Sequence, residues 1–372
     1  MADVTILGST PHVLSLTADG ERHDLHAMWL RDACGCTTCR NTVTSERLLD
    51  VDDIADDVVI EGADVRNGTV MVGLSDGHLV TIERRWLTQH LAEMDRSADP
   101  AAGCQLWRAG TERVMSWFDE AALVAGAERH RWLDALDRIG VVGVRTARRR
   151  EAGIRSVAEM IGPIRPTNYG TVWHVGATIE PSTAVDSEQP LRVHTDLPYR
   201  DSAPGVQLMM VESNGIEGGA STFVDGFAVA EHLRLADLDS WHLLTMIDFT
   251  YPFVRDDIEM HGRAPLIRLR SNGAYAEVRR APDLVGVPVV RAGDTPALYR
   301  AVRQWNALLD GEQFAVEHSV QPGEVIAWNN HRVLHGRTGF ELGSYGGRML
   351  FGCYVDIDDF RSARALAERT AR

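Results

Sequence analysis

The first 95 residues alternate short apolar runs with turn signals. In HVLSLTADG, DVVIEGADVRNG and DGHLVTI, apolar and polar positions alternate with a period close to 2, which is typical of strands with one buried face. The turns between the runs read ADG, RNG and SDG. The pattern predicts a small antiparallel β domain over residues 1–95, and the stretch EMDRSADPAAG predicts a domain boundary after it.

The second part of the chain, residues 105–372, combines helical and strand-like segments. Helical spacing of apolar residues runs through 111–140, ends at a glycine and is followed by the strand-like VVGVR. Short strand-like segments with Gly and Pro turns then dominate, interrupted by helical stretches at 226–246 and 295–311. The tail DDFRSARALAERTAR has amphipathic helical spacing. We therefore expect a mainly β catalytic domain with flanking helices.

Composition narrows the class of protein. The net charge of −15 and the scattered basic residues disfavour nucleic acid as a partner, because binding it needs a concentrated positive surface. No apolar run approaches the ~20 residues that span a bilayer, and the first residues carry no signal-type core, so we expect a cytoplasmic protein without a membrane partner. All 38 basic residues are Arg, which excludes lysine Schiff-base chemistry and a lysine phosphate loop.

A candidate iron site lies in the second domain. Two imidazoles and one carboxylate, His194, Asp196 and His335, match the ligand set that holds ferrous iron and leaves one face open. The i, i+2 spacing of His194 and Asp196 places both on one side of a strand, with Thr195 facing away. His335 follows 141 residues later (335 − 194), so its strand must lie beside that of His194. A double-stranded β-helix, or jelly roll, brings such strands together as facing strands of one sandwich.

Two further residues suit a dicarboxylate bound next to that metal. Arg348 follows His335 by thirteen residues (348 − 335) and is a candidate to clamp a distal carboxylate by a bidentate ion pair. Ser221, just past a Gly pair, offers a hydroxyl donor. On the triad alone, unrelated polar residues at turns stay an alternative; Arg348 and Ser221 favour a 2-oxoglutarate site.

A second candidate metal site lies in the first domain. Cys34, Cys36 and Cys39 fall within six residues, and such a cluster in a cytosolic chain is typical of metal binding. A fourth ligand would complete a tetrahedral Cys₃His zinc site, and His78 and His90 are both candidates. Free buried thiols or a disulfide are the alternatives.

Six ordered blocks run along nearly the whole chain: WLRDACGCTTC, DGHLVTIERRWL, IGPIRPTNYGTVWHV, HTDLPYRDSAPGVQLM, GGASTFVDGF and NNHRVLHGR. They resemble the iron(II)- and 2-oxoglutarate-dependent dioxygenases and, within them, the γ-butyrobetaine hydroxylase branch related to taurine dioxygenase. The resemblance implies a jelly-roll catalytic domain, a structural zinc in the N-terminal domain, O₂ as co-substrate and a homodimer. It implies these roles: iron ligands His194, Asp196 and His335; 2-oxoglutarate contacts Arg348 and Ser221; zinc ligands Cys34, Cys36, Cys39 and His78.

The same resemblance addresses the substrate. Tyr169, Trp173 and Tyr354 match an aromatic cage that holds a trimethylammonium group in this branch, where ring faces attract a cation without protons to donate. Asp186 falls where a fourth cage tyrosine is expected, and a carboxylate there also suits N–H donors. Arg279 and Arg280 stand in place of an Asn-rich segment that reaches the substrate carboxylate in this branch. Arginine there suggests a stronger anion, such as a phosphonate, or a differently placed carboxylate.

The resulting hypothesis is a hydroxylase of a small zwitterionic, ammonium-bearing acid similar to γ-butyrobetaine. The alternative is an oxygenase of an aminophosphonate, a trimethylaminophosphonate or another amine in secondary metabolism, with hydroxylation or desaturation as its outcome. A non-catalytic jelly-roll binding module and a cupin-like metalloenzyme without 2-oxoglutarate are further readings, in which Arg348 would have no role.

Overall fold

The computed structural model describes residues 4–18, 20–84, 86–87, 90–91, 99–111, 114–176, 188–214, 217–255, 257–341 and 348–371. The chain divides into two compact units, Met1–Arg96 and Ser97–Arg372. Each unit has its own buried hydrophobic cluster, so each is described by itself.

The first unit contains two three-stranded antiparallel sheets, β1-β2-β3 and β4-β5-β6. Their apolar positions alternate in and out of the core, as the period near 2 predicts: Leu14 and Leu16 on β2 and Val70 and Val72 on β5 are fully buried. Its elements are β1 (Thr5–Ser9), β2 (Val13–Ala18), β3 (Glu21–His26), α1 (Ala27–Asp32), the 3₁₀ turn η1 (Val51–Asp53), β4 (Ile60–Arg66), β5 (Thr69–Leu74) and β6 (Leu79–Glu83).

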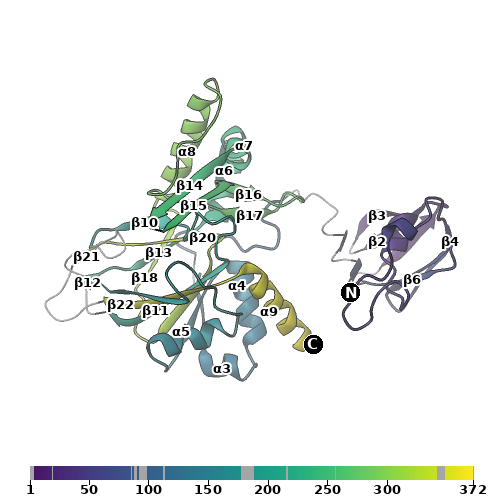
Figure 1. Ribbon diagram of the computed structural model, residues 1–372, viewed down its shortest axis with the longest axis horizontal. Helices are drawn as coiled ribbons and strands as arrows, with labels where there is room; N and C mark the ends of the chain where they lie inside the picture. Colours follow the sequence, from purple (N-terminus) through teal and green to yellow (C-terminus); the bar gives the residue numbers. More distant parts are fainter. Residues whose placement is uncertain are drawn as a thin grey trace. The chain divides into compact units, whose positions relative to one another are not determined.

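The second unit is the predicted jelly roll, built on a six-stranded and a four-stranded sheet (Figure 1). The larger sheet has the order β7 (Ser116–Asp119), β8 (Val141–Arg145), β19 (Glu324–Asn329), β11 (Val206–Asn214), β22 (Arg348–Val355), β9 (Val172–Gly176). The smaller sheet has the order β10 (Leu191–His194), β20 (Val333–Arg337), β13 (Ser221–Asp225), β18 (Ala315–His318). Three further pairs are β12 (Glu217–Gly218) with β21 (Phe340–Glu341), β14 (Asp248–Arg255) with β15 (Ile258–Pro265), and β16 (Ile267–Leu269) with β17 (Tyr275–Val278).

Helices cover the jelly roll on two sides (Figure 1). The two faces of the larger sheet belong to different hydrophobic clusters, as strand β11 shows. Leu208 and Met210 pack in the cluster on the helix-covered face, whereas Met209 and Val211 pack in the cluster between the two sheets. One helical group packs on the larger sheet: α3 (Glu120–Val124), α4 (Arg129–Ile139), α5 (Arg150–Ala158) and α9 (Ile357–Thr370). The other packs with the β14–β17 hairpins: α6 (Gly226–Ala236), α7 (Leu238–Met246) and α8 (Thr295–Leu309).

The helix expected throughout 111–140 is wrong at 116–119, whereas α3 and α4 occupy much of the rest. Residues Ser116–Asp119 form β7, which pairs in parallel with β8. The Trp117 ring lies against Gly143 of β8, where a Cβ would come within 2.4 Å of it, so this tertiary contact takes precedence over helical spacing. The expected end is correct, because Gly140 terminates α4 with a φ of 90°.

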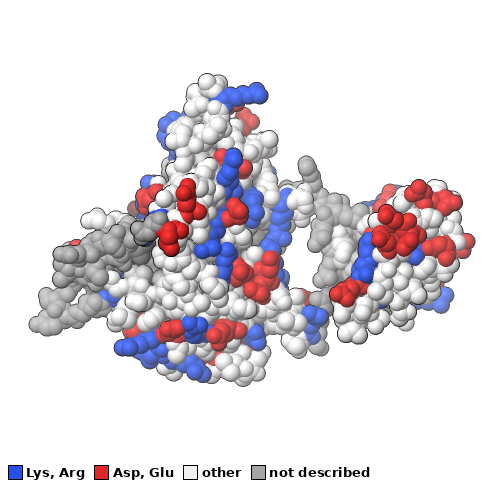
Figure 2. Space-filling view, viewed as in Figure 1, with Lys and Arg blue, Asp and Glu red and all other residues white. Residues whose placement is uncertain are grey.

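No helix in the described part of the chain is long and apolar enough to cross a membrane. On the face drawn in Figure 2, basic and acidic side chains of the second unit are interspersed.

Candidate metal and co-substrate site

His194 and His335 lie directly opposite each other on neighbouring antiparallel strands, β10 and β20. Their ring centroids are 4.4 Å apart. The expectation that their strands are adjacent is correct, but they are hydrogen-bonded neighbours in one sheet and not facing strands of a sandwich. His194 Nδ1 lies 2.9 Å from the carbonyl oxygen of Arg192, and donation to this carbonyl leaves Nε2 with a lone pair for a metal.

Asp196 lies just beyond the end of β10, and its backbone is held in place. Its N–H donates to Asn330 Oδ1 at 3.0 Å, and Asn330 Nδ2 donates back to the Asp196 carbonyl. Thr195 is buried and donates to the carbonyl of Val278, so it faces away as predicted. The ligand atoms of His194, Asp196 and His335 consequently lie within 4.8 Å of one another.

The electrostatics of this group suit a divalent cation. Burial opposes ionisation of Asp196, but the two imidazoles and the Tyr354 hydroxyl outweigh it and lower the pKa of Asp196. Burial and the neighbouring His194 lower the pKa of His335 to about 3, so this ring is neutral at pH 7. An ionised carboxylate and a neutral imidazole are the forms that ligate metals. The residues present therefore fit iron.

The two oxygens of Asp196 have different neighbours. Oδ1 lies 3.2 Å from His194 Nε2 and 3.8 Å from His335 Nε2. Oδ2 accepts from Tyr354 Oη at 2.7 Å and from Gln207 Nε2 at 2.6 Å. Gln207 is absent from the sequence-based site, because a single glutamine in an apolar strand carries no motif.

Arg348, at the start of β22, is a buried cation. It is 6% exposed, and its Nε and Nη1 have no hydrogen-bond partner among the described residues. Burial and the nearby Arg337 lower the pKa of Arg348 to about 10. Arg337 pairs in register with Ser221, which is also buried. A buried guanidinium beside a second one is stabilised by an anion, so the arrangement suits the distal carboxylate of a dicarboxylate.

Aromatic side chains gather near Asp196. The Trp173 and Tyr354 ring centroids are 6.0 Å apart, and Trp173 lies against Gly352, where a Cβ would come within 2.0 Å of its indole. Tyr169 is 45% exposed. Tyr199, which the sequence did not single out, is buried and lies close enough to Tyr354 to contribute to its raised pKa. The predicted cage residue Asp186 lies outside the described residues.

The neighbours Arg279 and Arg280 differ in their partners. Arg279 bonds to Glu277 and to the carbonyls of Pro198, Arg200 and Asp201, so its contacts are structural. Arg280 exchanges two hydrogen bonds with Thr195, the central residue of the HTD motif. Its Nη2 donates to Asp310 at 2.8 Å, whereas its buried Nε and Nη1 have no partner in the described part of the chain.

Comparison with known proteins decides the family. Residues 108–354, two thirds of the chain, match the family described as Taurine catabolism dioxygenase TauD, TfdA family. The chain belongs to this dioxygenase family. Residues 9–82 match the family described as Gamma-butyrobetaine hydroxylase-like, N-terminal. The predicted membership is confirmed, and the family is Fe(II)- and 2-oxoglutarate-dependent.

Three relatives are similar to this dioxygenase over most of its length. The gamma-butyrobetaine dioxygenase of Pseudomonas sp. (strain AK-1) is 30% identical, with 95% of this chain and 92% of that protein covered. The gamma-butyrobetaine dioxygenase of Homo sapiens is 27% identical, covering 93% and 92%. The trimethyllysine dioxygenase of Meyerozyma guilliermondii is 24% identical, covering 90% and 88%.

The N-terminal unit of the dioxygenase brings three thiols together. The sulfur atoms of Cys34, Cys36 and Cys39 lie within 4.8 Å of one another, which fits a thiolate metal site. A hydrogen bond from Thr38 lowers the pKa of Cys36 to about 6, and burial raises that of Cys34 to about 11.

The predicted fourth ligand, His78, is one side chain away from the thiols. Arg31 Nη1 lies 3.2 Å from Cys39 Sγ, and Arg31 Nη2 lies 3.2 Å from His78 Nε2. The Arg31 guanidinium therefore bridges the cluster and His78. Its positive charge stabilises thiolates.

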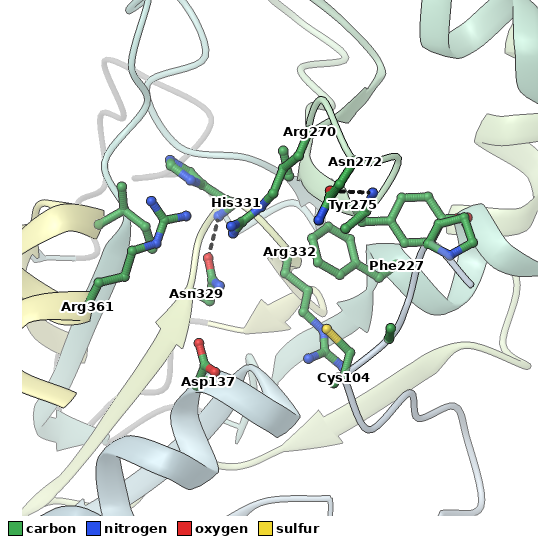
Figure 3. Close-up of a pocket in the computed structure, with 16 residues that line it drawn as sticks. Cys104, Asp137, Phe227, Arg270, Asn272, Tyr275, Asn329, His331, Arg332 and Arg361 are labelled. Atoms are coloured by element: carbon green, nitrogen blue, oxygen red, sulfur yellow. Dashed lines mark hydrogen bonds between the residues drawn. The ribbon is translucent and has the colours of Figure 1, made fainter. Parts of the chain in front are cut away.

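A cavity of about 280 Å³ lies elsewhere in the catalytic unit (Figure 3). None of the predicted site residues lines it. One wall is Arg332, whose guanidinium is occupied by Asp225 and by the carbonyls of Arg138 and Gln105. These contacts join Arg332, just before β20, to α4 and to the end of β13, so the arginine in this wall is structural.

Proposed function

We propose that this dioxygenase hydroxylates a small zwitterion that carries a trimethylammonium group and an acid. The observation that carries the proposal is Arg280: its backbone bonds to Thr195 of the metal motif, and its buried Nε and Nη1 have no hydrogen-bond partner among the described residues. The gamma-butyrobetaine and trimethyllysine dioxygenases similar to this chain support a trimethylammonium substrate.

The charged residues near the metal motif indicate where iron and 2-oxoglutarate would bind. His194, Asp196 and His335 would hold Fe(II), which when bound with 2-oxoglutarate supplies the oxidising power for an unactivated C–H bond. Arg348 would bind the distal carboxylate of 2-oxoglutarate, and the Ser221 hydroxyl would donate a hydrogen bond to the same carboxylate. No side chain of this group needs to act as a general base.

The cation end is aromatic. We assign the trimethylammonium group to the faces of Tyr169, Trp173 and Tyr354, because ring faces attract a cation that has no N–H to donate. The Tyr354 hydroxyl is bonded to Asp196, so its ring is anchored. Asp186 stays a predicted fourth member.

The anion end is Arg280. Its Nε and Nη1 are N–H donors that are available to a substrate anion such as a carboxylate or a phosphonate. Asp310 neutralises part of the charge, and this partial neutralisation favours the singly charged carboxylate. The phosphonate is the second candidate, since arginine replaces neutral amides here.

For the first unit we propose structural zinc held by Cys34, Cys36, Cys39 and His78, with Arg31 moving aside. The proposed domain bounds are 1–95 for this unit and 105–372 for the catalytic one. Elemental analysis of the native protein tests the zinc assignment: we expect one zinc per chain, lost in Cys39→Ala and reduced in His78→Ala. Zinc fully retained in His78→Ala would exclude His78 as a ligand.

A two-by-two substrate panel tests the activity. The panel combines a carboxylate or phosphonate end with a trimethylated or free amine, on chains of equal length, and succinate release is measured over the substrate-free background. We expect the trimethylated carboxylate to give the highest kcat/KM. A preference for free amines would overturn the aromatic assignment. If no compound stimulates succinate release, the substrate class is wrong.

Arg280→Met tests the anion end, with Arg192→Met as the matched control. Arg192 also pairs with Asp310, but its side chain is 57% exposed. We expect Arg280→Met to raise KM for both acids and Arg192→Met to leave KM unchanged. Equal effects of both variants would mean that Asp310, and not the substrate, explains the role of Arg280.

A further inference from the structure

The metal-binding carboxylate is held by a row of side chains on the larger sheet. In the register of that sheet, Gln207 on β11 is opposite Trp328 on β19 and opposite Tyr354 on β22. Gln207 and Tyr354 both donate to Asp196 Oδ2, and the Trp328 ring lies 4.8 Å from that of His335. Paired strands fix these three side chains, so their placement does not depend on loops.

Gln207 is energetically unfavourable where it stands. It is 1% exposed in the middle of the sheet, and its Oε1 is buried without a hydrogen-bond partner in the described ranges. An unsatisfied buried polar group destabilises the folded state, because it loses its hydrogen bonds to water without replacement. An apolar side chain of the same length would avoid this cost, so the amide has to be explained by its contact with Asp196.

We propose that Gln207 and Tyr354 are positioning residues that hold Oδ2 of Asp196, so that this carboxylate binds the metal through Oδ1 alone. The inference rests on the proposed iron site. A carboxylate that binds through both oxygens occupies two coordination positions, whereas one held to a single oxygen leaves a position for co-substrate or O₂. Tyr354 also belongs to the proposed cation cage, so its hydroxyl links that cage to the metal ligand.

The test uses Gln207→Met and Tyr354→Phe, which keep the shape of each side chain and remove one donor. The probe is Mn(II) alone, without 2-oxoglutarate or substrate, because Mn(II) prefers oxygen and imidazole ligands over the thiols of the N-terminal unit. Partners of metal ligands typically change metal affinity 10- to 100-fold, so we expect the Mn(II) Kd to rise by roughly that factor in each variant. The double variant should weaken binding by less than the product, because both donors hold one oxygen.

Thermal unfolding of the metal-free protein separates positioning from a structural role. We expect Gln207→Met to leave Tm unchanged or to raise it, because the unpaired amide oxygen is removed. The control is Leu208→Ala on the same strand, whose side chain is fully buried in the helix-covered cluster. It should lower Tm without changing the Mn(II) Kd.

The outcomes separate this inference from the proposed function. An unchanged Mn(II) Kd in both variants, with tight binding by the native protein, overturns the positioning role and leaves the iron site standing. A lower Tm of Gln207→Met with an unchanged Kd also overturns it, since Gln207 would then be structural. Failure of the native protein to bind Mn(II), with His194→Ala no different, removes the iron site and the inference together.

Discussion

The metal end and the substrate end of the site are built from different kinds of structure. At the metal end, paired strands bring His194 opposite His335, and donors from β11 and β22 bond to Asp196. At the substrate end, Arg280 follows the end of β17, and two of its buried nitrogens lack partners among the described residues. The donors at the metal end are paired within the fold, whereas we propose that a ligand pairs with Arg280 at the substrate end.

The largest expected effect comes from the metal end. His335→Ala should abolish succinate formation, because it removes one of the three proposed iron ligands. Iron content and 2-oxoglutarate turnover are the measurements, with Arg280→Met as the contrasting variant that retains iron. Turnover by His335→Ala close to that of the native protein would show that the metal is held elsewhere.

The adjacent residues Arg279 and Arg280 allow a direct comparison of a structural arginine with one proposed to bind substrate. Arg279 and Glu277 are each 1% exposed and form an ion pair, and removing one partner of a buried pair costs about 3–5 kcal/mol. We expect Arg279→Met to lower the free energy of unfolding, measured by urea denaturation, by about 3–5 kcal/mol. Arg280→Met should change stability far less and act on substrate KM instead. The reverse order would mean that the unpartnered guanidinium is the structural one.

Arg348 has the role for the co-substrate that we propose for Arg280 at the substrate. Hydrogen bonds to charged groups contribute about 1.5–3 kcal/mol, so Arg348→Met should raise the 2-oxoglutarate Kd roughly 10- to 150-fold. The stability of the ligand-free protein should not fall, because a buried guanidinium with unpartnered N–H groups is removed. Calorimetric titration with 2-oxoglutarate and thermal unfolding check the two parts. Unchanged 2-oxoglutarate affinity would assign the carboxylate to another cation.

The sequence predicted the metal end better than the substrate end for a physical reason. The spacing of His194 and Asp196 is a local pattern, and the distant His335 requires only that its strand lie beside that of His194. The sequence predicted this adjacency but expected facing strands, whereas the two strands pair within one sheet. The contact of Gln207 with Asp196 depends on which strands become neighbours, and no local pattern reports that. The same applies to β7: its register with β8 depends on the contact of Trp117 with Gly143, which helical spacing could not reveal. Arg279 and Arg280 look alike in sequence, and only their contacts separate them.

The smallest effect tests the aromatic part of the substrate end. Trp173→Leu should weaken recognition of a trimethylammonium substrate by about 1–2 kcal/mol, or roughly 5- to 30-fold in KM, because a desolvated cation–ring contact is lost. KM for the free-amine partner of the same acid should change less, since an amine with N–H groups also bonds to polar acceptors. Trp117→Leu is the control, because that indole lies on Gly143 of β8 and belongs to neither end of the site. An equal rise in KM for both amines in Trp173→Leu would show that Trp173 contributes only shape. Binding of the cation would then depend on a negative charge at the substrate end.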